Sequence, residues 1–497
     1  MTTSPPRFSA KTAAVLLLMM IGAAVLSVVV FSKTSLRLDE AQSLFQVSRA
    51  LPGMYHLVAQ DVHVPLYHTL LWVWTSLFGG DITTARYLSL VFFLATIPSV
   101  YFLGKLVFGR RAGLFAALLV TISPFMQWYG SEARMYSLLA FVTVVHQIAF
   151  VKVFKEGESR HWAWYALLSV VGVYVHYFFV FVLLSDAVAY FIYRRRFPRF
   201  AFPKFTLVAL LSIASLLPWL WYVYRLGAAG NAEPYLETPS SGDLFNTYAQ
   251  FLFGFQVSYL NTIIISLWPV VVLLAFFSLQ KKKKTPPEAI FLVVAAVLPV
   301  LATFVISIIY RPVYESRYLI VALPALMVLF AWIISLYPQG IRRVLQVGLV
   351  TIILALLVVQ TVSPNTPVKE DYREAVAYIS GHATGSDVVI ATAPFTVYPI
   401  EYYYKGPAKV TTQPIWDRFS QGSIPAFDAH NLQKETAENT ADYQHAWLVL
   451  SYDQGYNAKV KDYYDNHFKR LFAKEFSPGL AVYEYKIRYD SPISLTK

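Results

Sequence analysis

Cysteine is absent from this chain of 497 residues, and charged residues are scarce. Without cysteine there is no disulfide framework, no thiolate metal site and no cysteine nucleophile. Charged side chains make up 14% and apolar ones 57% of the sequence, whereas a soluble globular protein has about 25% charged and about 45–50% apolar residues. A water-soluble enzyme of ordinary design is therefore excluded, and the composition predicts a membrane protein.

Acidic residues are also few, which gives a formal net charge of +12. Residues 1–362 hold 27 Lys and Arg against 13 Asp and Glu, whereas residues 363–497 hold 14 against 16. The basic excess belongs to the apolar part of the chain, where the enrichment of Lys and Arg in cytoplasmic loops explains it. The charge gives no reason to expect a nucleic-acid partner.

Apolar runs near the roughly 20 residues that a bilayer crossing needs recur along the chain. The first, at 11–31, lacks a small-residue cleavage site and is interpreted as a retained anchor rather than a signal peptide. The stretch 162–193 is too long for one crossing and predicts two helices that turn near His176. Residues 65–79 are short for a span and predict a re-entrant or interfacial helix. Single spans are predicted at 85–108, 112–128, 136–154, 205–223, 263–280, 288–309, 317–336 and 343–362.

The predicted fold class is a polytopic α-helical membrane protein with about 11 spans. With 65–79 not crossing, the basic loops, including the four lysines at 281–284, fall on the same side as the N-terminus. The positive-inside rule then puts the N-terminus in the cytoplasm and the loop 32–84, which carries an acidic pair, outside. We expect a multi-pass protein of the cytoplasmic membrane, with residues 1–362 as its transmembrane domain.

Residues 363–497 have the mixed composition of a small extracytoplasmic α/β domain. Helix-like patterns alternate with strand-like ones, and no glycine-rich phosphate loop or paired Cys and His ligands occur. We expect this domain to support or cover the site rather than to catalyse. The predicted helices lie at 370–380 and 457–467, and the predicted strands at 387–392, 447–452 and 480–485.

Two adjacent carboxylates, Asp39 and Glu40, follow the first span by only a few residues. One carboxylate in partly apolar surroundings can act as a general base while its neighbour holds a substrate or a cation. The pair therefore admits a divalent cation near Asp39, although no ligand set in the sequence requires a metal. The alternative is structural: an Asp capping a surface helix, with Glu in its first turn.

Two further polar clusters lie on the predicted outer side. Asp61 and His63 precede an apolar helix and could orient a sugar hydroxyl or ligate a divalent ion, although a pair spaced by one residue is a weak metal signal. Glu132, Arg134 and Tyr136 lie between two spans, where a guanidinium suits a phosphate bidentately. A structural ion pair between Glu132 and Arg134 is the alternative.

Other polar groups occur at the same predicted membrane depth. Placing a charged side chain there costs free energy, so such residues usually have a function. Arg86 could instead snorkel to the surface, and Arg317 could pair with a nearby glutamate. Transfer of a sugar from a lipid phosphate needs a carboxylate to activate the acceptor and cations to stabilise the departing phosphate. The early carboxylates and the arginines at later outer turns supply both, and we expect them to share one pocket. The additional candidate substrate-binding residues are Arg86, His176, Tyr314 and Arg317.

These residues resemble a known family, the dolichyl-phosphate-mannose protein mannosyltransferase-like family of bacteria (glycosyltransferase family 39, of the C-type membrane class). The resemblance covers residues 10–340 and implies a multi-spanning enzyme that uses polyprenyl-phosphate-linked sugars outside the cytoplasmic membrane and inverts the anomeric carbon. The segments that carry it are Asp39-Glu40, 61–67, 85–89, 106–119, 123–138, His176-Tyr177 and 316–320.

By this resemblance Asp39 is the general base and Glu40 its partner in acceptor or sugar binding. Arg134, with Glu132, and Arg317 match the phosphate side of the family's site. Val64 stands where the family's second proline would be, which leaves the loop after Asp61 and His63 less constrained. No Asp-x-Asp motif occurs, which argues against a nucleotide-sugar donor. The implied partners are a polyprenyl-phosphate-linked sugar, membrane lipid, and an acceptor that is a protein, a lipid or a glycan.

Two other classes of function compete with glycosyl transfer. A flippase or transporter of a polyprenyl-linked substrate would place ionisable residues at the bilayer midplane and show inverted repeats, and the sequence displays neither. A non-catalytic scaffold would leave the polar clusters without a role.

Overall fold

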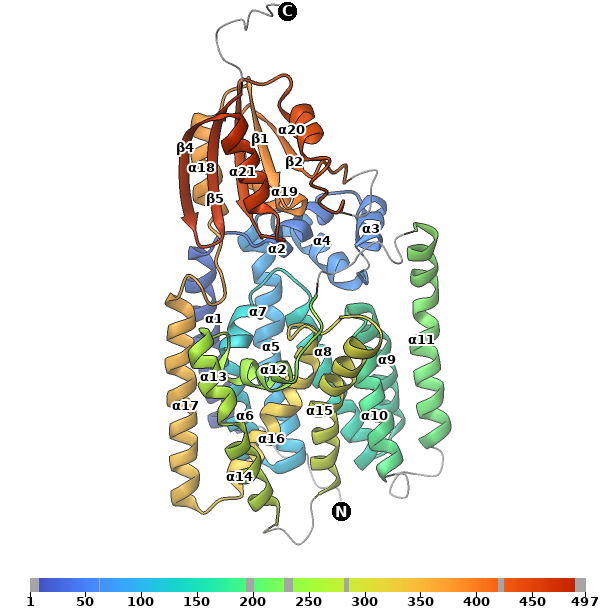
Figure 1. Ribbon diagram of the computed structural model, residues 1–497. Coiled ribbons are helices and arrows are strands. Elements are labelled where there is room, and N and C mark those ends of the chain that lie inside the picture. The colour runs from blue at the N-terminus through green and yellow to red at the C-terminus, as the bar shows by residue number, and fades with distance from the viewer. Residues whose placement is uncertain are drawn as a thin grey trace, which may run out of the picture. The chain divides into compact units, whose positions relative to one another are not determined.

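The computed structural model describes residues 9–61, 63–193, 201–227, 236–280, 286–418 and 424–487. The chain is mainly α-helical, with one five-stranded sheet near its C-terminal end (Figure 1). It divides into two compact units. The first holds the described residues of Met1–Ser32, His63–Arg225 and Glu233–Ser363, and the second those of Lys33–Val62, Leu226–Ala232 and Pro364–Lys497.

Long apolar helices make up most of the first unit. Within the described residues, seven helices are long and apolar enough to cross a membrane, or up to eight if one bent pair counts as a span. The chain is thus a multi-pass membrane protein, and the figure of about 11 spans stays a prediction. The helices are α1 (Ala10–Lys33), α4 (Leu66–Phe78), α5 (Ile82–Phe108), α6 (Arg110–Ile122), α7 (Pro124–Tyr129), α8 (Tyr136–Lys155), α9 (Ser159–Val175), α10 (Phe179–Tyr193), α11 (Ala201–Arg225), α12 (Ser241–Phe253), α13 (Ser258–Ser266), α14 (Trp268–Gln280), α15 (Pro287–Ile309), η2 (Tyr318–Ala322), α16 (Leu323–Ser335) and α17 (Gln339–Val362).

Proline accounts for most differences between the predicted spans and the observed helices. The run 112–128 breaks at Ser123, whose Oγ accepts from Met126 N at 3.2 Å while Pro124 opens α7. The run 263–280 breaks before α14, whose second residue is Pro269, and Pro324 likewise opens α16 after a 3₁₀ turn. A proline has no N–H to donate and fits the first turn of a helix, so each break restarts a helix.

The two short helices predicted around His176 are confirmed, because α9 ends at Val175 and α10 begins at Phe179. Helix α4 falls within the segment predicted as re-entrant or interfacial. At 13 residues it is about 20 Å long, which is short of a hydrocarbon core. Helix α12 was not predicted; its signal is Ser240 followed by Asp243, which together form a capping box.

The second unit contains the sheet, whose strand order is β2-β1-β3-β5-β4. Strands β2 and β3 run parallel to β1, and β5 runs antiparallel to both β3 and β4. Helices pack on both faces, so β1 is buried along its whole length. The elements are α2 (Leu38–Val47), α3 (Leu51–Gln60), α18 (Tyr372–His382), β1 (Asp387–Thr392), η3 (Pro394–Thr396), α19 (Val397–Tyr403), β2 (Lys409–Gln413), α20 (Leu432–Thr440), β3 (His445–Ser451), α21 (Asn457–His467), β4 (Lys469–Ser477) and β5 (Leu480–Lys486).

The predicted α/β tail is confirmed as a small helix-and-sheet domain, with the three predicted strands observed as β1, β3 and β5. Strand β1 alternates between two cores: Val389 and Ala391 face one, and Val388 and Ile390 the other. Burial on both faces gives a continuous apolar run, which the sequence displays clearly. Strands β2 and β4 were missed because each has an exposed, polar stretch.

Residues 33–61 pack with the C-terminal part of the chain, although the sequence places them over 300 residues away. Leu36 N donates to Tyr403 Oη at 3.0 Å, and Arg373 N donates to Ser35 Oγ at 3.2 Å. Phe45 of α2 packs on Tyr398 of α19, with ring centroids 4.9 Å apart. The helix that carries the acidic pair therefore belongs to the unit that contains the sheet. The functional division at residue 362 stays a prediction.

Candidate active site

The acidic pair lies in the first turn of α2. Glu40 is fully buried, and its Oε2 accepts from the backbone N of Arg37 at 3.0 Å. This contact closes the N-terminus of the helix. The structural alternative is correct in placing Glu40 in the first turn and wrong in making Asp39 the cap, because Arg37 is the N-cap residue. Asp39 is half-buried on the same turn. Of the two carboxylates, Asp39 is thus the better placed to act on a substrate, and its role as a base stays a prediction.

Asp61 is the C-cap residue of α3 in the same unit, where its Oδ2 accepts from Gln46 Nε2 at 3.2 Å. Tyr398 interacts with this carboxylate and also lies under the guanidinium of Arg418, 5.3 Å from its ring. Arg418 in turn pairs with Glu401 at 2.6 Å. The predicted partner of Asp61, His63, belongs to the other unit.

Two arginines and three histidines gather in the first unit, and we call them the Arg134 cluster: His63, His68, Arg134, His176 and Arg317. Arg134 Nη2 lies 2.7 Å from His63 Nε2. The rings of His63 and His68 stack, with centroids 6.0 Å apart. His176 interacts electrostatically with His63, Arg134 and Arg317. The structure therefore brings together four predicted site residues that lie far apart in the sequence, and it adds His68.

Most of the Arg134 cluster is buried: Arg134 is 4% exposed, His68 0% and His176 7%. Burial, and then His63 and the two guanidinium groups, lower the pKa of His176 to about 3. His176 is thus neutral at physiological pH. Its Nδ1 accepts from Phe178 N at 3.1 Å, so its Nε2 carries the proton. Fixed positive charge and a neutral N–H donor are suited to a phosphate oxygen.

An aromatic side chain that the sequence analysis did not select, Tyr318, links members of the cluster. The guanidinium of Arg317 lies 5.4 Å from its ring centroid, and the His176 ring lies 5.2 Å away. Tyr136 is 6.5 Å from the same ring. Trp219 of α11 donates its Nε1–H to the carbonyl of His63 at 3.0 Å. In the sequence, Tyr318 could have been recognised by its position directly after Arg317, because a tyrosine there can stack on the guanidinium group.

The remaining predicted residues have contacts that hold the first unit together. Arg86 is 2% exposed, and its Nη1 donates at 2.8 Å to the carbonyl of Phe31 near the C-terminal end of α1. This is a favourable place for a cation, because the last carbonyls of a helix lack partners. Tyr314 Oη lies 2.7 Å from Thr247 Oγ1, and burial raises the pKa of Tyr314 to about 12. Glu132 is 2% exposed. Their roles in substrate binding stay predictions.

The turn that presents Arg134 is held by close packing at Gly130. A Cβ at this position would overlap Met126 O and lie 2.6 Å from the ring of Phe93. Ser131 Oγ donates to Gln127 O at 3.0 Å, and Arg134 N to Glu132 O at 2.6 Å. The chain therefore cannot accept a larger residue at Gly130 unless the turn shifts.

Gly130→Ala is expected to destabilise the protein by about 1–3 kcal/mol, because the added methyl group overpacks the backbone of α7. Thermal unfolding of the purified protein measures the change. Gly348→Ala is the matched control, since nothing lies within 4 Å of a Cβ there and alanine favours a helix interior by about 1 kcal/mol. Equal unfolding temperatures for the two variants would contradict this interpretation of the turn.

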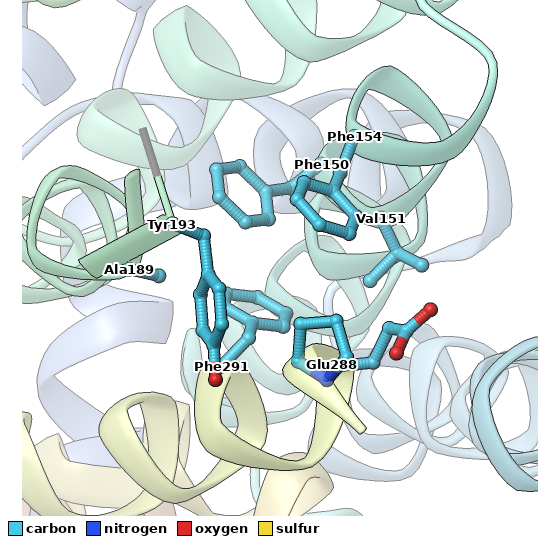
Figure 2. A pocket seen from close by; sticks show the side chains of 8 residues that line it. Phe150, Val151, Phe154, Ala189, Tyr193, Glu288 and Phe291 are labelled. Carbon is cyan, nitrogen blue, oxygen red and sulfur yellow. The ribbon is translucent and has the colours of Figure 1, made fainter. Parts of the chain in front are cut away.

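An apolar pocket lies between α8, α10 and α15 (Figure 2). Its charged lining residue, Glu288, pairs with Lys155 at 3.1 Å. Lys155 ends α8, a helix of about 30 Å that begins beside Arg134. The pocket is therefore remote from the Arg134 cluster. Its lining residues are Phe150, Val151, Phe154, Ala189, Tyr193, Pro287, Glu288 and Phe291.

Side chains that could ligate a metal ion lie close together at a place away from the predicted site. Among the described residues, the group of three whose ligand atoms lie within 4.8 Å of one another is Glu156, Glu158 and His161. It lies where α8 meets α9, and its glutamates are exposed. The predicted cation near Asp39 stays a prediction.

Residues 62–222 match the family model described as dolichyl-phosphate-mannose-protein mannosyltransferase. The family resemblance predicted from the sequence is confirmed. The matched segment includes His63, Arg86, Arg134 and His176. Among curated proteins, none matches this sequence.

Solved structures extend the likeness over nearly the whole chain. ArnT from Cupriavidus metallidurans in the apo state is similar with a TM-score of 0.62 at 14% identity, covering 96% of this chain and 98% of ArnT. ArnT bound to undecaprenyl phosphate gives 0.60 at 13% identity, with the same coverage. The oligosaccharyltransferase AglB from Archaeoglobus fulgidus, in complex with an inhibitory peptide and a dolichol-phosphate, gives 0.54 at 12% identity over 98% of this chain and 75% of AglB. The chain therefore has the fold of C-type membrane glycosyltransferases.

Proposed function

We propose that the protein is an inverting glycosyltransferase that moves a sugar from a polyprenyl-phosphate donor to an acceptor outside the cytoplasmic membrane. The Arg134 cluster carries this proposal. Two guanidinium groups and the neutral imidazole of His176 are suited to a phosphate, and charged side chains held within a membrane protein point to a function. Support comes from the similar fold of ArnT, which binds undecaprenyl phosphate, and of AglB, which binds a dolichol-phosphate.

In the proposed reaction Asp39 removes the proton from an acceptor hydroxyl or amine. The acceptor oxygen or nitrogen forms a bond to the anomeric carbon, and the bond from that carbon to the phosphate oxygen breaks with inversion. The electron pair leaves with the polyprenyl phosphate, whose negative charge Arg134 and Arg317 stabilise. Preorganised cations directed at a developing charge can lower a barrier by several kcal/mol.

The other predicted residues have supporting roles in this proposal. Glu40 holds the turn that carries Asp39 and contributes to acceptor or sugar binding, as do Asp61 and His63. The prenyl chain lies among the aromatic-rich helices, which bury apolar surface. The positive-inside rule supports a cytoplasmic N-terminus and an extracytoplasmic site. The acceptor is a protein, a lipid or a glycan, and the sugar is a hexose or a pentose.

Purified protein in lipid nanodiscs or vesicles, given a radiolabelled polyprenyl-phosphate sugar and candidate acceptors, tests the function directly. We expect the label to move to an acceptor and free polyprenyl phosphate to accumulate. Movement of the intact donor across the vesicle membrane without cleavage would indicate the flippase instead. Neither cleavage nor movement with any donor would reject both.

A further inference from the structure

The turn that joins α8 to α9 brings three metal-ligating side chains together. Gly157 follows the end of α8 with a φ of +65°, and its N–H donates to Val153 O at 3.1 Å. Glycine adopts positive φ without strain and commonly ends a helix in this way. The reversal leaves Glu156 and Glu158 on either side of the glycine, and His161 follows in the first turn of α9.

His161 is the buried member of this group. It is 5% exposed, whereas both glutamates are exposed. Within the described parts of the chain its Nδ1 has no hydrogen-bond partner, and its Nε2 lies 3.4 Å from Glu156 Oε2. This separation is longer than the roughly 2.7–3.2 Å of an N–H···O hydrogen bond. A buried imidazole without a good hydrogen bond is costly, so this side chain is suited to a ligand.

The distances match those between the ligands of a four-coordinate ion. Bonds of roughly 2.0–2.1 Å in a tetrahedral zinc site place neighbouring ligand atoms about 3.4 Å apart, and this is the separation of His161 Nε2 from Glu156 Oε2. Ligand atoms of all three residues lie within 4.8 Å of one another. Glu158 is exposed and can close the remaining gap by a change of rotamer, and water supplies the fourth ligand.

The charges around the turn are compatible with a cation. Glu158 Oε2 pairs with Arg160 Nε at 2.6 Å, but the glutamate side chain is 49% and the arginine side chain 70% exposed. An exposed ion pair contributes little free energy, so Arg160 does not hold the carboxylate against a competing ion. The nearby charge of Lys155 is paired with Glu288 at 3.1 Å. Two carboxylates are therefore available beside the imidazole.

This set of ligands selects a class of metal. An imidazole suits zinc and its transition-metal neighbours, whereas Mg²⁺ and Ca²⁺ prefer oxygen ligands alone. Zinc with three protein ligands and a water is a common arrangement. We propose that Glu156, Glu158 and His161 bind one Zn²⁺ ion where α8 meets α9.

The ion would cross-link two helices that belong to the candidate active site. Helices α8 and α9 lie side by side (Figure 1), and His146 Nε2 of α8 lies 3.1 Å from Ser169 Oγ of α9. Arg134 precedes the start of α8 and His176 follows the end of α9. Zinc therefore fastens the helix pair at the end remote from the Arg134 cluster. The inference goes beyond the proposed function, because the ion takes no part in sugar transfer.

Metal titration of the purified full-length protein, without a histidine tag, tests the site. Chelator-treated protein in nanodiscs is titrated with ZnCl₂, and bound zinc is measured by calorimetry and by elemental analysis. We expect one zinc ion per chain, retained in excess Mg²⁺ and Ca²⁺. X-ray absorption at the zinc edge is expected to show an imidazole nitrogen and oxygen ligands at about 2.0–2.2 Å.

Glu156→Gln and His161→Gln each remove one ligand. Each is expected to weaken zinc binding by at least roughly tenfold, since the loss even of an outer-shell partner costs about 10–100-fold in metal affinity. Glu438→Gln and His430→Gln are the matched controls, because they change exposed residues of the same types in the other unit, and both are expected to keep the wild-type affinity. If His161→Gln fails to fold, the exposed Glu156 decides.

Thermal unfolding separates a zinc site in the fold from zinc on the surface. A ligand that binds the folded state raises the unfolding temperature, so saturating zinc is expected to raise that of the wild type by a few degrees. The same zinc concentration is expected to leave Glu156→Gln unchanged, whereas Glu438→Gln responds as the wild type does.

Three results would overturn the zinc site: no zinc bound by the wild-type protein, wild-type zinc affinity in Glu156→Gln, or displacement of zinc by Mg²⁺ or Ca²⁺ at comparable concentrations. In the first case His161 and Glu156 form an ion pair only, and in the second the zinc is adventitious. Zinc binding at this turn without sugar transfer from any donor would reject the proposed transferase and leave the zinc site in place. Transfer without zinc binding would reject the zinc site alone.

Discussion

Asp39→Asn is expected to lower the rate of sugar transfer by about 10²–10⁴-fold, the usual contribution of a general base. The amide has nearly the size of the carboxylate but cannot take the proton of the acceptor. Because the change leaves the positive groups of the Arg134 cluster intact, the affinity for the polyprenyl-phosphate donor is expected to stay near that of the wild type. Single-turnover kinetics with a labelled donor, together with a direct donor-binding measurement, separates the two quantities.

Glu40→Gln is the matched control for this experiment. The amide oxygen of glutamine can still accept from Arg37 N, the contact that Glu40 makes at 3.0 Å, so the first turn of α2 is expected to persist. We expect a smaller loss of rate than in Asp39→Asn. Retained turnover in Asp39→Asn, or a larger effect in Glu40→Gln, would remove Asp39 as the base.

Arg134→Ala is expected to weaken binding of undecaprenyl phosphate by roughly 10–100-fold, since charge-assisted hydrogen bonds to phosphate are among the strongest polar contacts. Binding of the uncharged alcohol undecaprenol is expected to change little, because the lost interaction is with the phosphate. Comparing the two lipids by native mass spectrometry or by calorimetry in detergent isolates the contribution of the headgroup.

Two variants test whether position and geometry matter as well as charge. Arg134→Lys keeps a positive charge but not the planar fork of donors, so an intermediate affinity is expected. Arg225→Ala removes an exposed arginine of the same unit, one that lies 5.0 Å from the ring of Trp221, and is expected to leave phosphate binding unchanged. If Arg134→Ala binds undecaprenyl phosphate as tightly as the wild type, the proposed phosphate site is wrong.

Local chemistry made parts of the second unit predictable. Strand β1 and helix α21 occupy the predicted residues 387–392 and 457–467, because a doubly buried strand and an amphipathic helix each leave a local pattern. Strand β4 left none, since most of its side chains are exposed. Its pairing with β5 comes from hydrogen bonds between backbones, which composition does not encode.

Arg86 illustrates what local sequence cannot distinguish. An arginine at the start of a predicted span is equally consistent with a lipid phosphate, with snorkelling, or with a partner inside the protein. The structure gives it the carbonyl of Phe31, which lies 55 residues earlier in the chain. No helical or strand pattern in the sequence links Arg86 to Phe31, so their contact is visible only in the folded structure.

The sequence by itself determined that the chain crosses a membrane several times, that it ends in a small α/β domain, and that its candidate acids and arginines resemble those of one transferase family. These conclusions depend on composition, helical and strand periodicity, and short motifs, all of which are local. Only the tertiary structure decided that α2 packs with the sheet-containing unit, that Arg134 lies next to His63, and that the ring of His176 packs against that of Tyr318. Such contacts join segments far apart in the chain, and the packing of whole elements, rather than the pattern within any one of them, brings them together.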